Sequence, residues 1–178
     1  MNFSMKLSCL IIVASSTFWV ISASAKIQNL PTRETPRPVT SDGIPHIQID
    51  VEAVPEIAAL LLDRVSKISG VELRRTIVGR AGSTGFWLKD GIKMTRPDSI
   101  IRGREFAHSH PDGSLHISLP PELANQAIEA GWAVHHPWAA KNQGLEGFVM
   151  IYTPVSEVEL DVVFELVKQS YEFVTGND

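Results

Sequence analysis

Apolar residues recur every three or four positions in three stretches of the chain, which is the spacing of a helix with one buried face. The first stretch covers residues 56–68 and stops before Gly70, a residue that suits a helix end. The second covers residues 121–130. The third opens at Ser156 with Glu159 three residues on, the arrangement of an N-terminal capping box. The pattern therefore predicts three amphipathic helices.

Shorter apolar or alternating stretches lie between these helices and are typical of strands. They cover residues 71–78, 85–88, 100–110, 114–119 and 148–153. Most of them follow one another without an intervening helix, so the regular strand–helix alternation of a parallel sheet is missing. This order predicts an α+β fold, with a single, mostly antiparallel sheet and three helices packed on it.

The first 25 residues follow the pattern of a secretory signal peptide. Lys6 precedes an apolar run over residues 7–21, and Ala23-Ser24-Ala25 forms a small-x-small cleavage pattern. The run has about 15 residues, fewer than the roughly 20 of a membrane-spanning helix. We therefore expect cleavage after Ala25, export to the periplasm or the medium, and no stable membrane span in the mature chain.

Residues 26–45 contain four prolines and show no apolar period, which is typical of an extended linker. We expect the folded domain to cover residues 46–178, a length that suits one domain. The single cysteine, Cys9, lies in the predicted signal peptide, so no disulfide is expected. The net charge of −4 argues against nucleic acid as a partner, because nucleic acid favours a basic surface.

Three of the six histidines fall within residues 105–116, EFAHSHPDGSLH. The stretch HPDGS carries the residues of a tight turn, which would pair His108 with His116 across two antiparallel strands. Side chains alternate between the two faces of a strand. The same alternation should place Phe106 and His110 on the face of the paired histidines, and leave the opposite face apolar.

Three imidazoles on one small patch allow three interpretations. His108, His110 and His116 could bind a divalent metal such as zinc, iron or copper, since neutral histidine is a common ligand of these ions. They could instead transfer protons, since histidine titrates near neutral pH. They could also form an ordinary polar sheet face that is open to water. The spacing alone does not separate these interpretations.

Other residues could extend this patch. Strict alternation would put Glu105 on the apolar face, where its carboxylate would need a partner. The segment GWAVHHPW follows the second helix and contains Trp132, expected in the core, and His136, which could reach the patch or lie in an exposed loop. His46 lies at the start of the expected domain, and we expect no role for it.

Several common catalytic motifs are missing from the sequence. The glycine-rich stretch GRAGSTG lacks the lysine and the following helix of a phosphate-binding loop, and no dinucleotide fingerprint occurs. Ser83 and Ser114 lack the G-x-S-x-G context of a serine hydrolase. The sequence therefore carries no signature of a nucleotide cofactor and little support for a serine hydrolase.

The segment from residue 104 onward resembles the luciferase domain family, which includes fungal luciferases that oxidise a hydroxylated hispidin with O2. The shared pieces are R-E-x-A-H-x-H, L-H, G-W, H-P and Y-x-P, in this order and at compatible spacing. They fall on Arg104, Glu105, Ala107, His108, His110, Leu115, His116, Gly131, Trp132, His136, Pro137, Tyr152 and Pro154.

The resemblance implies an oxygenase without an organic cofactor that acts with O2 on a small phenolic or enolic, pyrone-like substrate. The expected catalytic residues are His108, His110, His116 and Glu105. The expected substrate contacts are Arg104, Phe106, Trp132, His136 and Tyr152. One histidine, His108 or His116, would remove a proton, and the resulting carbanion would react with oxygen without a metal.

Two alternatives stay open. The first is a metal-dependent oxygenase or hydrolase with His108, His110 and His116 as ligands of a divalent metal. The second is a non-catalytic exported protein that binds a small molecule or a partner in the cell envelope. The sequence predicts no oligomeric state.

Overall fold

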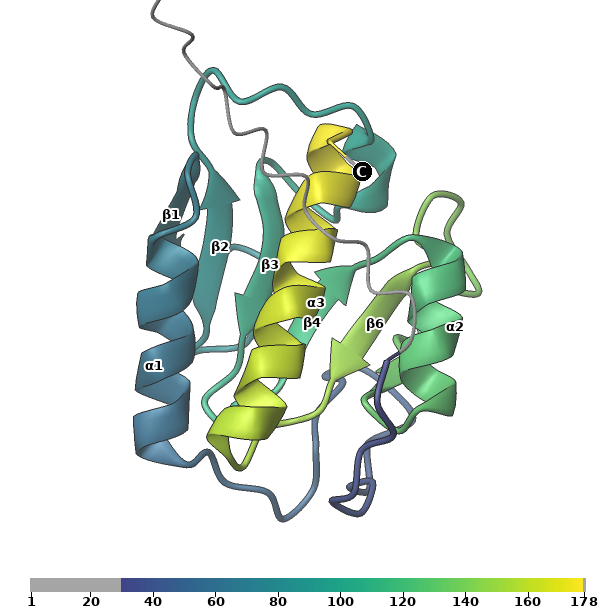
Figure 1. Cartoon of the computed structure of the whole chain (residues 1–178). Coiled ribbons are helices and arrows are strands. Elements are labelled where there is room, and N and C mark those ends of the chain that lie inside the picture. Colours follow the sequence, from purple (N-terminus) through teal and green to yellow (C-terminus); the bar gives the residue numbers. More distant parts are fainter. Residues whose placement is uncertain (1–29, 178) are drawn as a thin grey trace, which may run out of the picture.

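The computed structural model describes residues 30–177. Six strands form one antiparallel sheet and three helices pack against it, which confirms the predicted α+β class (Figure 1). The predicted signal peptide, residues 1–25, lies outside the described residues. Within residues 30–177, no helix is both long and apolar enough to cross a membrane.

The helices are α1 (Pro55–Ser66), α2 (Pro121–Glu129) and α3 (Glu157–Thr175), and one 3-10 turn, η1, spans Pro97–Ser99. The strands are β1 (Val71–Arg75), β2 (Thr84–Leu88), β3 (Glu105–Ser109), β4 (Leu115–Ser118), β5 (Ala133–His135) and β6 (Phe148–Ile151). Their order in the sheet is β1-β2-β3-β4-β6-β5. Figure 1 shows α1 and α3 lying across the front of the sheet, with α2 beside β6.

The hairpin of β3 and β4 has the predicted register. His108 pairs with His116, and Ala107 pairs with Ile117. The turn closes through a hydrogen bond of 2.8 Å from the His110 amide to the Ser114 carbonyl oxygen. Leu115 and Ile117 of β4 alternate with the histidine position and are fully buried in the core under the helices. The histidines therefore lie on the face of the sheet that the helices do not cover.

Strand β3 contains one extra residue relative to β2. Phe86 pairs with Ala107, whereas the next residue, Trp87, pairs with Glu105. Phe106 is the extra residue, and such a β-bulge changes the alternation of faces along a strand. Phe106 consequently packs in the core with Phe86, and Glu105 turns to the histidine face. The bulge corrects our expectation from strict alternation for both residues.

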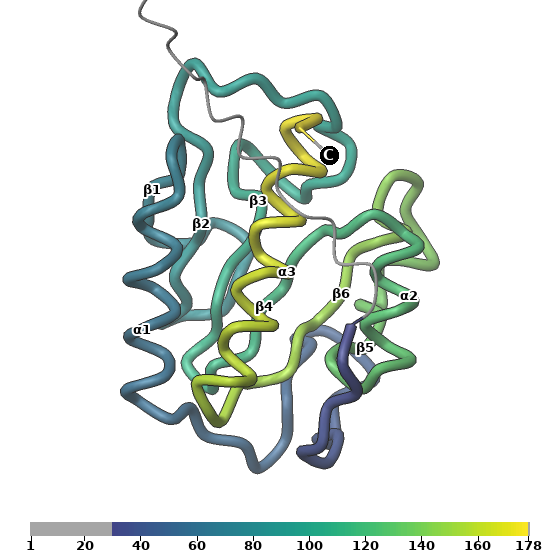
Figure 2. The backbone as a smooth tube through the Cα atoms, viewed as in Figure 1, coloured from purple at the N-terminus to yellow at the C-terminus, as the bar shows by residue number. Residues whose placement is uncertain are grey.

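Residues 30–49 lie against the domain without forming a helix or an extended strand. The chain runs beside α2 and β5 (Figure 2), where the Arg33 amide donates to the Ala130 carbonyl and the Trp132 indole N–H donates to the Pro31 carbonyl. The segment that the sequence suggested as a linker is thus in contact with the domain from residue 30. We call residues 30–49 the N-terminal strap.

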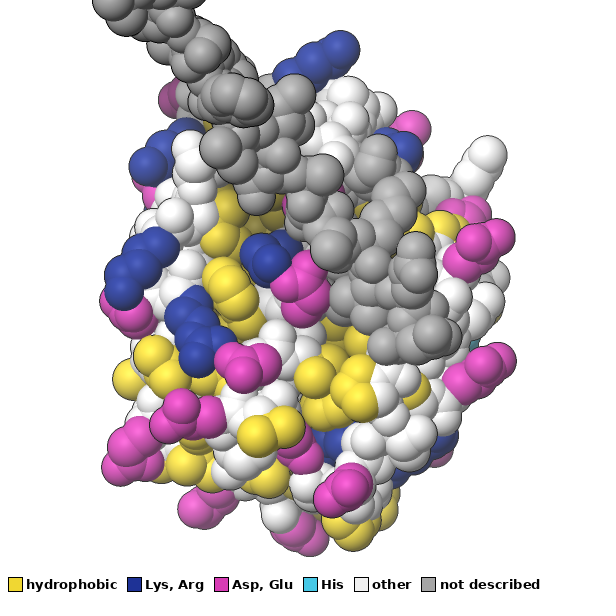
Figure 3. Space-filling model, viewed as in Figure 1, with side chains coloured by type: hydrophobic (Ala, Val, Ile, Leu, Met, Phe, Trp, Pro, Cys, Tyr) yellow, Lys and Arg dark blue, Asp and Glu magenta, His cyan; other side chains and the backbone are white. Residues whose placement is uncertain are grey.

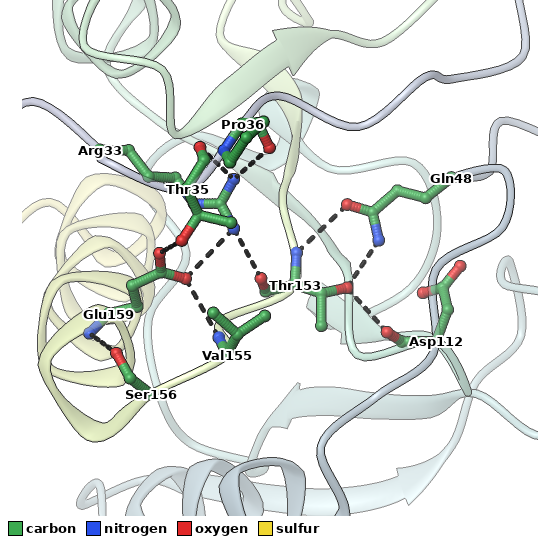
Figure 4. A network of polar contacts seen from close by, with 9 residues as sticks. All are labelled: Arg33, Thr35, Pro36, Gln48, Asp112, Thr153, Val155, Ser156 and Glu159. Carbon is green, nitrogen blue, oxygen red and sulfur yellow. Dashed lines mark hydrogen bonds and ion pairs between the residues drawn. The ribbon is translucent and has the colours of Figure 1, made fainter.

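A buried polar network fastens the strap to the rest of the molecule (Figure 4). Arg33 donates to the Thr153 carbonyl at 3.0 Å and to the Glu159 carboxylate at 3.1 Å. Gln48 donates through Nε2 to the Thr153 hydroxyl at 2.6 Å and accepts from the Thr153 amide at 3.2 Å. The Thr153 hydroxyl donates in turn to the Asp112 carbonyl at 2.7 Å. The strap is therefore tied to the turn that carries His110.

The exposed side chains of the helix-bearing side include both charge signs. Lys and Arg side chains lie among Asp and Glu side chains over this face (Figure 3). The ion pair between Arg64 of α1 and Asp161 of α3, at 2.5 Å, is one example, and both partners are partly exposed. Exposed pairs of this kind contribute little to stability, about 0–1 kcal/mol each, so the core holds the helices in place.

Candidate functional site

Five of the six histidines converge on the sheet face away from the helices. They are His46, His108, His110, His116 and His136, and all five are buried. His116 lies at the centre, because its ring centroid is 4.6 Å from those of His110 and His136, and 5.2 Å from that of His108. The polar sheet face open to water, one of our three interpretations, does not describe this arrangement.

Three different parts of the chain supply these rings. The β3–β4 hairpin provides three of them, and its register brings them together. His136 follows β5, and its amide continues the ladder by donating to the Phe148 carbonyl at 3.1 Å. His46 comes from the strap, and its ring stacks on His116 with an interplanar angle of 7°. The sequence did not predict a role for His46, because only the tertiary packing of the strap brings it next to His116. The sixth histidine, His135, is exposed.

Glu105 orients His108. One carboxylate oxygen, Oε1, lies 3.1 Å from His108 Nδ1 and accepts from the Thr76 hydroxyl at 2.6 Å. The other, Oε2, accepts from the Ile77 amide at 2.8 Å. An ionised carboxylate can only accept hydrogen bonds, so Nδ1 of His108 carries the ring proton. The lone pair on His108 Nε2 then points toward His116, whose Nδ1 is 3.2 Å away.

Asp112 orients His110 through Ser114. The Ser114 hydroxyl donates to Asp112 Oδ1 at 2.6 Å, and the Ser114 amide donates to the same oxygen at 3.0 Å. The hydroxyl oxygen is therefore left to accept a hydrogen bond from His110 Nδ1, at 2.8 Å. This chain places the ring proton of His110 on Nδ1 and leaves Nε2 with a free lone pair.

His136 and His46 have a different character. The Trp138 amide donates to His136 Nδ1 at 3.1 Å, so the ring proton of neutral His136 lies on Nε2. His46 Nδ1 lies 3.3 Å from His116 Nε2. Without an ion, His116 Nδ1 donates to His108 Nε2, and His116 Nε2 accepts from His46 Nδ1. An ion between His108 Nε2 and His116 Nδ1 would instead place the His116 proton on Nε2, where it would be donated to His46.

Two sets of three histidines have ligand atoms within 4.8 Å of one another. One set is His108, His110 and His116, and the other is His46, His116 and His136. Adjacent nitrogens of a tetrahedral site with metal–nitrogen bonds near 2.0–2.1 Å lie about 3.4 Å apart, and the His108–His116 distance of 3.2 Å is close to this value. The distances between ligand atoms therefore allow either set to hold an ion.

The hydrogen bonds around the rings favour the first set. Metal-binding histidines usually donate their other ring N–H to a carboxylate or another acceptor, which orients the ligand nitrogen. His108 and His110 have such partners in Glu105 and Ser114. His136 has a backbone donor at Nδ1 instead, so its other nitrogen carries a proton and cannot bind a metal in the neutral ring. The first set would leave at least one coordination position for a ligand.

Burial keeps most of these rings neutral. Desolvation, together with the charges of the neighbouring histidines, lowers the pKa of His110 and of His136 to about 3. The pKa of His116 is well below its ordinary value and that of His46 is lowered, again chiefly by burial. Neutral imidazole is the form that binds a metal. Such rings are weak proton acceptors near neutral pH, which disfavours a general base among these four.

A cavity of about 200 Å³ opens beside the five histidines. Its remaining wall is mainly apolar and includes Ile101, Trp138 and Phe148. Arg80, from the loop between β1 and β2, also lines it. A small ligand in this cavity would contact the histidine rings with much of its surface removed from water.

Four residues that we expected to contact the substrate lie outside the lining of this cavity. Phe106 and Trp132 are part of the core. Arg104 donates to the carbonyls of Leu88 and Lys89, both at 3.0 Å, and so fastens the end of β2. Tyr152 is buried beneath the guanidinium of Arg33, 5.7 Å from its ring centroid. His136 does line the cavity, and Glu105 contacts it through His108.

Residues 103–170 match the family model of the luciferase domain. This finding confirms the resemblance that the sequence suggested. No curated protein and no solved structure matches the chain. The matched segment contains the hairpin histidines, Glu105 and His136, whereas His46 and Arg80 lie outside it.

Proposed function

Because residues 103–170 match the luciferase domain family, we propose that this protein is a metal-dependent oxygenase that acts with O2 on a small phenolic or enolic substrate. In this proposal, His108, His110 and His116 hold one divalent transition metal ion. One observation carries it: three buried imidazoles converge, and a carboxylate orients two of them, directly or through a serine. The family match supports the oxygenase class.

The metal-dependent alternative is better supported than proton removal by His110 or His116. A base that works near neutral pH needs a pKa near the working pH, whereas burial lowers the pKa of His110 to about 3 and that of His116 well below its ordinary value. A metal ligand must be unprotonated, and the same burial favours that form. Imidazole ligands suit iron, copper and zinc, and of these iron and copper support chemistry with O2.

The surrounding residues would each have a defined part. A bound ion would supply a position for O2 or a substrate oxygen, together with the redox chemistry. Glu105 and the Asp112–Ser114 pair would hold His108 and His110 in their ligand tautomers. His46 would accept the Nε2 proton of His116. The apolar wall would exclude water from the substrate.

Oxygen uptake tests this proposal. We expect the full chain, loaded with iron or copper, to consume O2 in the presence of polyphenolic pyrones. Uptake should stop after treatment with a chelator and in His116→Ala, and should persist in the matched control His135→Ala, whose histidine is exposed.

The other outcomes separate the alternatives. Full O2 uptake after metal removal would contradict the requirement for a metal and favour the metal-free mechanism. A tightly bound metal without O2 uptake would favour a hydrolase, and ligand binding without turnover would favour a binding protein. We further propose, from the N-terminal sequence pattern, that the mature protein works outside the cytoplasm.

A further inference from the structure

Arg80 has a distinctive position at the histidine cavity. Of the described residues that line this cavity, it is the only one with a permanent charge. The five histidines are accompanied by Gly79 and by apolar side chains, and within residues 30–177 no Asp, Glu or Lys lines the space. Arg80 is about a third exposed, so a ligand in the cavity can reach it.

The loop that carries Arg80 is anchored at the same carboxylate that orients His108. Glu105 accepts hydrogen bonds from Thr76 and Ile77, and the Thr76 hydroxyl accepts from the Gly79 amide at 2.7 Å. Gly79 lies so close to the His108 ring that an added Cβ would stand 2.9 Å from its Cδ2. The backbone before Arg80 is therefore held against the proposed metal ligands.

The guanidinium of Arg80 retains hydrogen-bonding capacity. Its Nε is buried and has no acceptor among the described residues. Asp112 Oδ2 lies 3.7 Å from Nη2, which is close enough for an ion pair but beyond hydrogen-bond distance. Asp112 uses its other oxygen for Ser114. The buried Nε is out of reach of a ligand in this arrangement, so an acceptor in the cavity would meet the exposed part of the side chain.

We propose that Arg80 binds a carboxylate group of the substrate, so that the site takes a small carboxylate with a flat apolar body. A guanidinium presents paired N–H groups in one plane, and these match the two oxygens of a carboxylate. Trp138, Phe148 and Ile101 would contact the body of the ligand, and a volume of about 200 Å³ suits a single ring. This substrate class deepens the proposed function and rests on it for the site of reaction.

Benzoate and benzamide provide a matched pair of probes, because they share a shape and differ in charge. Calorimetric titration of the metal-free full chain should show benzoate binding about tenfold tighter than benzamide, the effect of one charge-assisted pair. In Arg80→Gln, the preference should disappear, so that benzoate and benzamide bind with about equal affinity. It should remain in Arg75→Gln, which removes an exposed arginine from the end of β1.

A benzoate preference that survives in Arg80→Gln would overturn the assignment, as would equal binding of both probes, or of neither, by the unsubstituted chain. If Arg80→Gln does not fold, Arg80→Lys replaces it. The lysine keeps the positive charge but lacks the paired N–H groups of the guanidinium, so benzoate should bind only a few-fold tighter than benzamide. An unchanged tenfold preference would overturn the proposal.

Metal content, measured on the same samples, separates this proposal from the proposed function. Arg80→Gln should bind as much added zinc as the unsubstituted chain. A chain that prefers benzoate through Arg80 but binds no metal would support the carboxylate site and contradict the metal-dependent reaction. A benzoate preference that instead appears only when zinc is present, and that persists in Arg80→Gln, would show that the carboxylate binds the metal. That result would overturn the role of Arg80.

Discussion

Glu105 Oε1 lies 3.1 Å from His108 Nδ1, although the two residues are three positions apart in one strand. In a regular strand, such residues face opposite sides of the sheet. The contact exists because Phe106 is an extra residue in β3, which turns Glu105 to the histidine face. A local irregularity of the strand thus gives a buried imidazole the carboxylate partner that a metal ligand needs.

Replacing Glu105 with Gln should weaken metal binding. The amide offers one acceptor oxygen where the carboxylate has two, and these now serve Thr76, Ile77 and His108. Loss of such an outer partner typically lowers metal affinity by about 10- to 100-fold. Competition with a chelator measures this affinity. Glu146→Gln, which changes an exposed glutamate, is the control, and an equal loss there would contradict the role of Glu105.

Gly79→Ala should displace His108. The added Cβ would stand 2.9 Å from His108 Cδ2, 3.2 Å from its Nε2 and 3.0 Å from the Thr76 hydroxyl oxygen, so the ring or the loop must move. Overpacking of this kind costs about 1–3 kcal/mol of unfolding free energy. The unfolding free energy, measured with urea, and the metal affinity should both decrease. Gly43→Ala should change neither, because no atom lies within 4 Å of its added Cβ.

Gln48→Ala should loosen the strap that carries His46. The substitution leaves the buried Thr153 amide without its acceptor and removes the donor to the Thr153 hydroxyl. An unsatisfied buried group costs about 1–3 kcal/mol. Amide hydrogen exchange over residues 40–49 should accelerate in this variant and not in Gln143→Ala, whose glutamine is exposed. Unchanged exchange would show that the network does not hold the strap.

The metal-free protein should lose stability as the pH falls below about 6.5. Burial lowers the pKa of His110 and His136 to about 3 in the folded state, whereas the unfolded chain binds these protons near pH 6.5. Each such histidine stabilises the fold fully above pH 6.5 and contributes about 1.4 kcal/mol less for each pH unit below it, down to about pH 3.

Urea unfolding at a series of pH values, with a chelator present, measures this slope. His136→Gln removes one of the groups and should make the slope between pH 6.5 and 5 shallower. His135→Gln, at the exposed neighbour, should leave it unchanged. Equal slopes in the two variants would contradict a buried neutral His136.

The hairpin was predictable from the sequence, and the reason is local. The stretch HPDGS determines the turn, the turn determines the register, and the register pairs His108 with His116. The helices were equally predictable from their apolar period, and Ser156 caps α3 by accepting from the Glu159 amide at 3.3 Å. The Glu159 carboxylate, however, accepts from the Val155 amide, one residue before the cap, and also binds Arg33.

What the sequence could not predict depends on distant contacts. The bulge at Phe106 is visible only once β2 is paired with β3. His46 reaches His116 from 70 positions away because Gln48 and Arg33 fasten the strap to Thr153. The strap itself shows no apolar period, since polar contacts to the backbone hold much of it.

Elemental analysis of the full chain after saturation with metal and removal of the excess tests the central claim most directly. The unsubstituted protein should retain about one ion per chain. His108→Ala, His110→Ala and His116→Ala should each retain almost none, whereas His46→Ala, His136→Ala and the exposed control His135→Ala should retain about one. Retention by the three hairpin variants, or loss in His46→Ala and His136→Ala alone, would contradict the assignment of these three histidines as the metal ligands.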